Sequence, residues 1–168
     1  AADGALKEIE ASGELDIAEL EEFLALYEQW GRLDEFARRA LELARLYAAR
    51  GQDKKALALL RRAIKVTRGH TELRRELAEL FAAQGRLPDA LRELQALASS
   101  FAQAGKADEE LAVLRRAAAL APTDTQVRLR LVDALQARGE REAAAMQLED
   151  LAAVLISNKS YSEALGAL

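Results

Sequence analysis

Bulky apolar side chains recur along the chain at fixed distances from six turn-like positions. Five of these positions are isolated glycines, Gly31, Gly51, Gly85, Gly105 and Gly139, and the sixth is Lys159 within an Asn-Lys-Ser triplet. A Phe or Leu stands eight residues before each turn, and a Tyr, Phe or Leu stands four residues before it. A spacing of four places both side chains on one stripe of an α-helix. The pattern therefore predicts helices that end at each turn.

The residues after each turn are mostly small or aliphatic, which lets two antiparallel helices approach closely. Five residues after the turns stand Phe36, Ala56, Ala90, Glu110, Ala144 and Ala164. Glu110 departs from this pattern, because a small Ala is expected at its position. The predicted helices cover 5–12, 17–30, 32–50, 53–67, 72–84, 86–104, 107–120, 125–138, 140–157 and 160–168. Thr123 and Gln126 fit a capping box that opens the helix over 125–138.

The turns are separated alternately by 20 and 34 residues, so the chain repeats with a period of 54 residues. Without gaps, 31–84 aligns with 85–138, and Leu60-Arg61-Arg62-Ala63 falls on Leu114-Arg115-Arg116-Ala117. Such fixed-period similarity predicts a stacked array of helices. Three helices in strict up-down alternation would exchange inner and outer layers from one unit to the next. The sequence does not decide between this arrangement and three-helix layers, so it does not predict which helices form the concave face.

This register resembles the tetratricopeptide repeat (TPR), a 34-residue helix–turn–helix family. In the window 37–70, the matching residues are Leu43, Ala44, Tyr47, Gly51, Ala56, Leu60 and Ala63. The windows 17–50, 71–104 and 125–158 match similarly. The resemblance implies an all-α fold, a right-handed α-solenoid of antiparallel hairpins with nine to ten helices. We expect one TPR-like domain over 1–168, truncated at both ends from a longer bacterial protein, since Ala2, Leu6 and Ile9 match the interior of a later helix.

The resemblance also implies a binding groove, because ligands in this family commonly lie on the first helix of each hairpin. The residues carried over to these positions are Arg38, Glu42, Arg45, Glu72, Arg75, Glu79, Arg92, Gln95, Gln126, Arg130 and Asp133. A chaperone-tail adaptor is disfavoured, because the Lys and Asn of that subfamily's carboxylate clamp are replaced here.

Charge is unevenly distributed along the chain. Residues 1–30 carry a net charge of −8, residues 31–75 carry +8, and the whole chain carries −4. Such a division can steer a charged partner, or it can reflect solvated helix faces. Nucleic acid is not an expected partner, because the pI is near 5.2 and no aromatic stacking platform accompanies the arginines.

The chain holds little material for catalysis. It has no Cys, a single His at position 70 and no run of glycines that could cradle a phosphate. We therefore predict no catalytic residue, no metal site, no cofactor and no enzyme activity. No apolar run is long enough for membrane insertion. The aromatic residues at the stripe positions are expected in the core. For Trp30, the sequence does not distinguish between packing in the protein and contact with a partner.

We predict a non-catalytic scaffold that binds another protein or peptide on its concave groove or an exposed helix face. The candidate systems are bacterial secretion, pilus assembly, motility and cell polarity. Two alternatives are self-association through the solenoid ends and a regulatory domain of a larger enzyme. The expected compartment is the cytoplasm, with the periplasm as the alternative.

Overall fold

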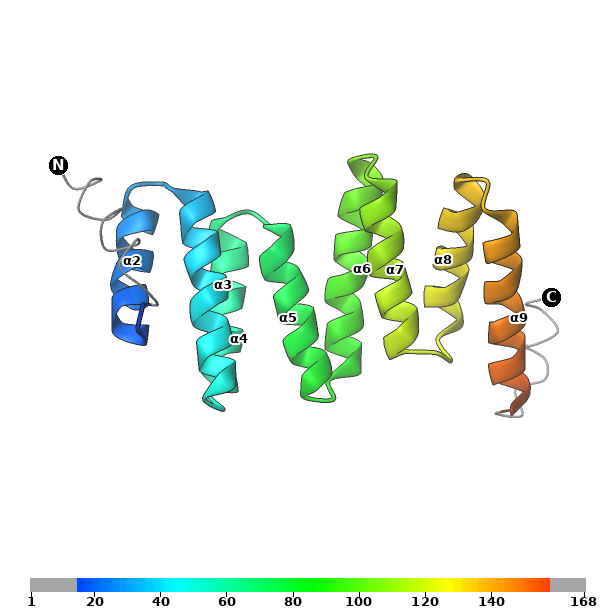
Figure 1. The fold of residues 1–168 in the computed structure, drawn as a ribbon, viewed down its shortest axis with the longest axis horizontal. Helices are drawn as coiled ribbons and strands as arrows, with labels where there is room; N and C mark the ends of the chain where they lie inside the picture. Colours follow the sequence, from blue (N-terminus) through cyan, green and yellow to red (C-terminus); the bar gives the residue numbers. More distant parts are fainter. Residues whose placement is uncertain (1–14, 158–168) are drawn as a thin grey trace. The chain divides into compact units, whose positions relative to one another are not determined.

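The computed structural model describes residues 15–157, and within this range the regular secondary structure is all α-helix with no strand (Figure 1). Its eight helices are α2 (Ile17–Gln29), α3 (Leu33–Ala49), α4 (Asp53–Val66), α5 (Thr71–Ala83), α6 (Leu87–Gln103), α7 (Ala107–Leu120), α8 (Thr125–Ala137) and α9 (Arg141–Ser157). The all-α prediction is confirmed. The count is lower than the predicted nine to ten, since the helices expected at 5–12 and 160–168 lie outside the described residues.

The turn glycines end their helices by one repeated hydrogen-bond motif. At the first turn, Gly31 has φ +68°, and its N–H donates to the carbonyl of Glu28 while the N–H of Arg32 donates to that of Tyr27. This is the Schellman arrangement, which needs a left-handed residue and so favours glycine. The same pair of bonds recurs at the four later turn glycines. The carbonyl accepting the longer-range bond belongs each time to the stripe residue four positions before the turn.

The chain divides into two compact units, Ala1–Leu77 and Ala78–Leu168, and the division falls within α5. In the first unit, α3 packs against both α2 and α4. In the second unit, α6 packs against α7, α7 against α8, and α8 against α9. The prediction of one truncated domain over 1–168 stays a prediction.

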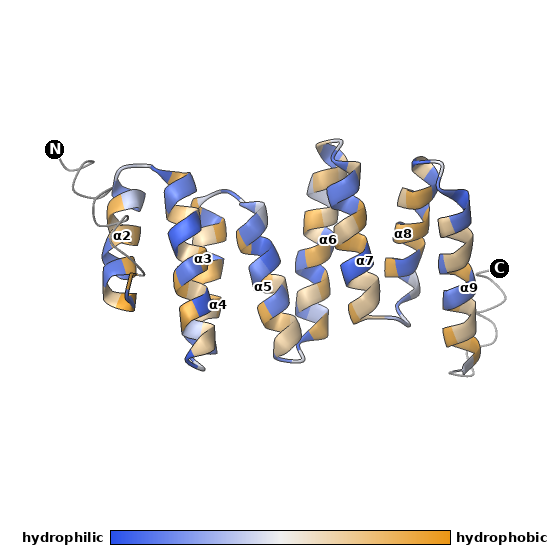
Figure 2. Ribbon diagram, viewed as in Figure 1, coloured by the Kyte–Doolittle hydropathy of each residue, from blue (hydrophilic) through white to orange (hydrophobic). Residues whose placement is uncertain are grey.

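The predicted stripes form the core. All twelve stripe residues at eight and four positions before the turns are buried, with at most 6% of each residue exposed. The small residues Ala56, Ala90 and Ala144 are also buried, with at most 2% exposed, so the helices can approach closely at these points. Glu110, at the corresponding position after Gly105, is only half-buried, because its charged carboxylate stays in contact with water. Figure 2 shows hydrophobic and hydrophilic residues alternating along each helix.

The start of α8 differs from the sequence prediction. The N-cap is Asp124, whose carboxylate accepts a hydrogen bond of 3.0 Å from the N–H of Val127. The capping box expected from Thr123 and Gln126 is therefore wrong by one residue. Asp is among the most favoured N-cap residues, because its short carboxylate reaches the unpaired N–H groups of the first turn.

Candidate partner-binding surfaces

The predicted binding residues of α3 line one groove of the first unit, which we call the α3 groove. It has a volume of about 550 Å³ and is lined by Leu15, Arg38, Leu41, Glu42, Arg45, Leu46 and Ala49. The three charged residues had been predicted from the sequence, whereas the leucines add an apolar lining. The groove thus combines an apolar surface with both signs of charge.

Two of the three charged groups in the α3 groove are held by neighbouring side chains. Glu42 accepts a bond of 2.7 Å from Arg39, and Arg45 donates to Glu76 of α5 through Nε at 2.9 Å and Nη2 at 2.7 Å. The hydrogen bond and charge of Glu76 raise the pKa of Arg45. Arg38 is exposed, and its guanidinium forms no ion pair with another described residue.

The remaining predicted residues lie on two different sets of helices. Glu72 and Arg75 pair on α5 at 3.7 Å, and Glu79 binds Arg116 of α7. The five others lie on α6 and α8. Arg92 and Gln95 belong to α6, and Gln126, Arg130 and Asp133 belong to α8. Arg130 donates to Ser99 of α6 at 3.1 Å.

Side-chain contacts between helices two apart in the chain show which helices lie in the same layer. In the second unit, Glu79–Arg116 joins α5 to α7, whereas Ser99–Arg130 joins α6 to α8. In the first unit, Arg45–Glu76 joins α3 to α5, and an ion pair between Glu28 and Arg62 joins α2 to α4. Helices of odd and even number therefore form separate layers within each unit. Within the first unit, the predicted residues of α3 and α5 share one layer, and within the second unit Glu79 of α5 lies in a different layer from the predicted residues of α6 and α8.

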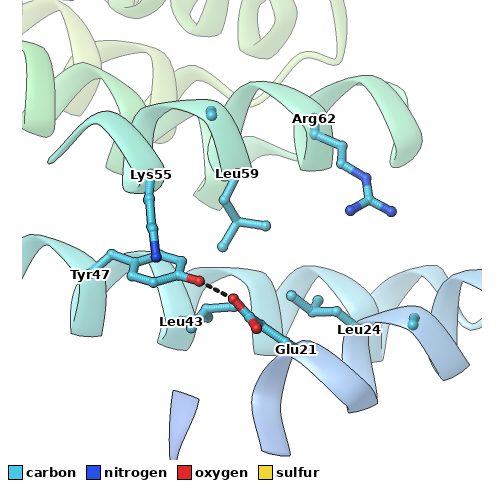
Figure 3. A pocket seen from close by; sticks show the side chains of 9 residues that line it. Glu21, Leu24, Leu43, Tyr47, Lys55, Leu59 and Arg62 are labelled. Atoms are coloured by element: carbon cyan, nitrogen blue, oxygen red, sulfur yellow. Dashed lines mark hydrogen bonds between the residues drawn. The ribbon is translucent and has the colours of Figure 1, made fainter. Parts of the chain in front are cut away.

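A second groove of the first unit lies between α2 and α4, and we call it the α2–α4 slot (Figure 3). Its volume is about 460 Å³, and it is lined by Glu21, Leu24, Ala25, Leu43, Tyr47, Lys55, Ala58, Leu59 and Arg62. Two side chains of α3, Leu43 and Tyr47, form part of the lining. The sequence had placed both in the core and had singled out Arg62 only within an arginine pair.

Tyr47 connects the two walls of the slot. Its hydroxyl donates to the carboxylate of Glu21 on α2, and Lys55 of α4 places its Nζ 5.3 Å from the centre of the ring (Figure 3). Sequence reasoning missed Glu21 and Lys55. The available signal was the acidic charge of residues 1–30 beside the basic charge of 31–75, because α2 and α4 come from these two blocks.

Burial raises the pKa of Tyr47 to about 12, and the hydrogen bond and negative charge of Glu21 add to this effect. Because the folded pKa lies above the ordinary value of 10, Tyr47 favours folding fully below pH 10 and loses this contribution as the pH rises from 10 to 12. We expect a tyrosinate absorbance step near pH 12 that is absent in Tyr47→Phe. In Glu21→Gln the step should move toward lower pH while staying above 10. A wild-type titration without the late step would contradict this expectation.

The residues considered for other roles lie outside the two grooves. Trp30 is 40% exposed at the end of α2. His70 lies between α4 and α5, and its buried Nδ1 has no hydrogen-bond partner. Within 15–157, no cluster of His, Cys, Asp or Glu could hold a metal ion. In the same range no helix is both long and apolar enough to cross a membrane.

Residues 37–80 match the tetratricopeptide repeat family model. This match begins on α3, continues through α4 and ends within α5, so α3 and α4 form its hairpin. This segment of the chain is therefore similar to a tetratricopeptide repeat. The buried stripes and glycine turns that recur in both units fit this match. No curated protein matches this chain.

Several solved structures are similar to this chain at low identity. YrrB, a TPR protein with an unusual peptide-binding site, is 14% identical, with 86% of this chain and 88% of that chain covered and a TM-score of 0.38. MamA is 13% identical, with coverage of 86% and 94% and a TM-score of 0.37. A putative kinesin light chain of Podosopora anserina, with TPR-like repeats, is 19% identical, with coverage of 84% and 96% and a TM-score of 0.34.

Proposed function

We propose that this protein is a non-catalytic, TPR-like scaffold that binds a segment of another protein in the α3 groove. The observation that carries the proposal is the exposed Arg38 guanidinium beside the apolar side chains of Leu41 and Leu46. Glu42 and Arg45 are already engaged by neighbouring residues. Arg38 is therefore the group of this groove that is best placed to bind a partner's carboxylate.

The proposed partner segment has an acidic residue next to an aliphatic one. The carboxylate would form a charge-assisted pair with Arg38, for which the guanidinium offers two parallel donors. The aliphatic side chain would cover Leu41 and Leu46 and remove their apolar surface from water. Arg45 is held in place by Glu76, so it limits the width of the groove rather than reaching for the partner. The candidate systems stay bacterial secretion, pilus assembly, motility and polarity.

The test places a photo-crosslinking residue at Leu41, identifies the captured segment by mass spectrometry, and measures its affinity as a synthetic peptide. Arg38→Glu should weaken binding by about tenfold or more, which corresponds to a loss of about 1.4 kcal/mol. Arg92→Glu is the matched control, because Arg92 is an exposed arginine of α6 that had also been predicted to bind.

Equal affinities for wild type and Arg38→Glu would refute the proposed groove, and a loss in Arg92→Glu alone would move the site to the layer of α6 and α8. Capture of a second copy of this chain would support the alternative of self-association. The exposed Met146 and Ile156 of α9 favour that alternative.

A further inference from the structure

The two walls of the α2–α4 slot carry opposite charges. On the α2 side, Glu21 and Glu22 are exposed and Glu28 is half-buried. On the α4 side the exposed charged residues are all cations, namely Lys54, Lys55, Arg61, Arg62 and Lys65. No Asp or Glu occurs between positions 54 and 71. The acidic and basic blocks of the sequence thus face each other across an apolar lining.

The cations of α4 are only partly neutralised by the protein itself. Arg62 pairs with Glu28, and Lys55 lies over the ring of Tyr47. No ion pair joins Lys54 or Lys65 to another described residue. These two lysines lie with Ala58 on one stripe of α4, because the positions 54, 58 and 65 are separated by four and seven residues. Ala58 lines the slot, so the lysines lie at positions that flank it.

The 54-residue period supplies an internal comparison for the slot. Arg62 corresponds to Arg116, and Ala25 corresponds to Glu79. In the second unit Arg116 reaches across from α7 to Glu79 of α5, with Nε–Oε1 and Nη2–Oε2 distances of 2.8 and 2.5 Å. The first unit has a methyl group at the position of this carboxylate, and Arg62 pairs instead with Glu28, about one turn further along α2. The slot beside Ala25 therefore has no carboxylate in the place that Glu79 fills in the second unit. Leu59 is half-buried, whereas its counterpart Val113 is only 3% exposed.

We propose that the α2–α4 slot is a second docking site, which takes an amphipathic helical segment of a partner protein. Apolar side chains of the segment lie over Leu24, Leu43 and Leu59. Its acidic flank faces the lysines of α4, and its basic flank faces Glu21 and Glu22 of α2. The lining residues of α4 extend from Lys55 to Arg62, a length of about 10 Å, so the segment engages about two helical turns.

Charge complementarity selects this occupant over a uniformly charged one. A segment with acidic residues on both flanks would be repelled by α2, and one with basic residues on both flanks would be repelled by α4. Because the slot belongs to the layer of α2 and α4, it is separate from the α3 groove of the proposed function. Both sites can therefore be tested on the same protein.

The probe is a fluorescein-labelled helical peptide with a ridge of leucines, glutamates along one flank and lysines along the other. Its affinity is measured by fluorescence anisotropy against wild type, Ala25→Glu and Ala25→Gln. Ala25→Glu introduces the carboxylate that closes the corresponding position of the second unit, and Ala25→Gln has nearly the same size without the charge. We expect Ala25→Glu to weaken binding by about tenfold or more and Ala25→Gln to weaken it much less.

Two further peptides keep the leucine ridge but carry only glutamates or only lysines on both flanks, and both should bind more weakly than the mixed peptide. Amide chemical shifts should change at Ala25, Ala58 and Leu59 when the mixed peptide binds. No binding to wild type, equal binding to Ala25→Glu, or equal binding of the three peptides would overturn the proposal. Arg38→Glu should leave the peptide affinity unchanged, so failure of the α3 groove and failure of the slot give different results.

Discussion

Leu60→Ala is expected to lower the free energy of unfolding by about 2–5 kcal/mol, because the side chain is fully buried and its removal leaves a cavity between packed helices. Leu60 lies on α4, nine residues after the turn glycine Gly51. The measurement is urea denaturation followed by the fluorescence of Trp30. This residue is the single tryptophan of the chain and lies in the same compact unit as Leu60.

Leu33→Ala is the matched control for this prediction. Leu33 begins α3 and is 39% exposed, so its truncation should change the midpoint far less than Leu60→Ala. If both variants unfold at the same urea concentration, Leu60 does not occupy the core position assigned to it.

Ala90→Leu is expected to destabilise the second unit by about 1–3 kcal/mol, because three added carbon atoms overfill a fully buried site. Ala90 occupies the small-residue position five residues after Gly85, where α6 comes close to its neighbours. The unfolding of this unit is followed by circular dichroism at 222 nm, since Trp30 lies in the other unit.

Ala96→Leu provides the comparison on the same helix. Ala96 is exposed, and Leu and Ala have similar helix propensities, so this variant should unfold close to wild type. Equal destabilisation of the two variants would show that the effect comes from the added leucine and not from close helix packing at position 90.

Local patterns in the sequence were sufficient to predict the eight helices of residues 15–157. Gly31 and its four counterparts have positive φ angles, and glycine adopts that conformation without the steric penalty of a Cβ atom. The stripe residue Tyr27 is buried through the same helical spacing that identified it. The cap at Asp124 was missed, because Thr123 and Asp124 are both good N-cap residues and only the backbone decides which one begins α8.

The candidate sites depended more strongly on tertiary packing. Resemblance to the TPR family selected Arg38 and Arg130 by equivalent positions, yet the structure places them on α3 and α8, in different units. Glu21 and Lys55 drew no attention in the sequence, because 34 residues separate them and neither belongs to a motif. Packing of α2 and α4 on either side of Tyr47 brings them to one slot.

The sequence by itself determined, to within one residue, where the helices of residues 15–157 begin and end, and which stripe of each is buried. Both depend on neighbours within a few residues. Only the tertiary structure decided which helices share a layer and which charges face each other. Those relations depend on how successive helices pack, and the 54-residue period is compatible with either layer lying inside. Ala25 and Glu79 illustrate the difference, because they are equivalent in the repeat. Ala25 lines the slot of the first unit, whereas Glu79 forms an ion pair with Arg116 in the second unit.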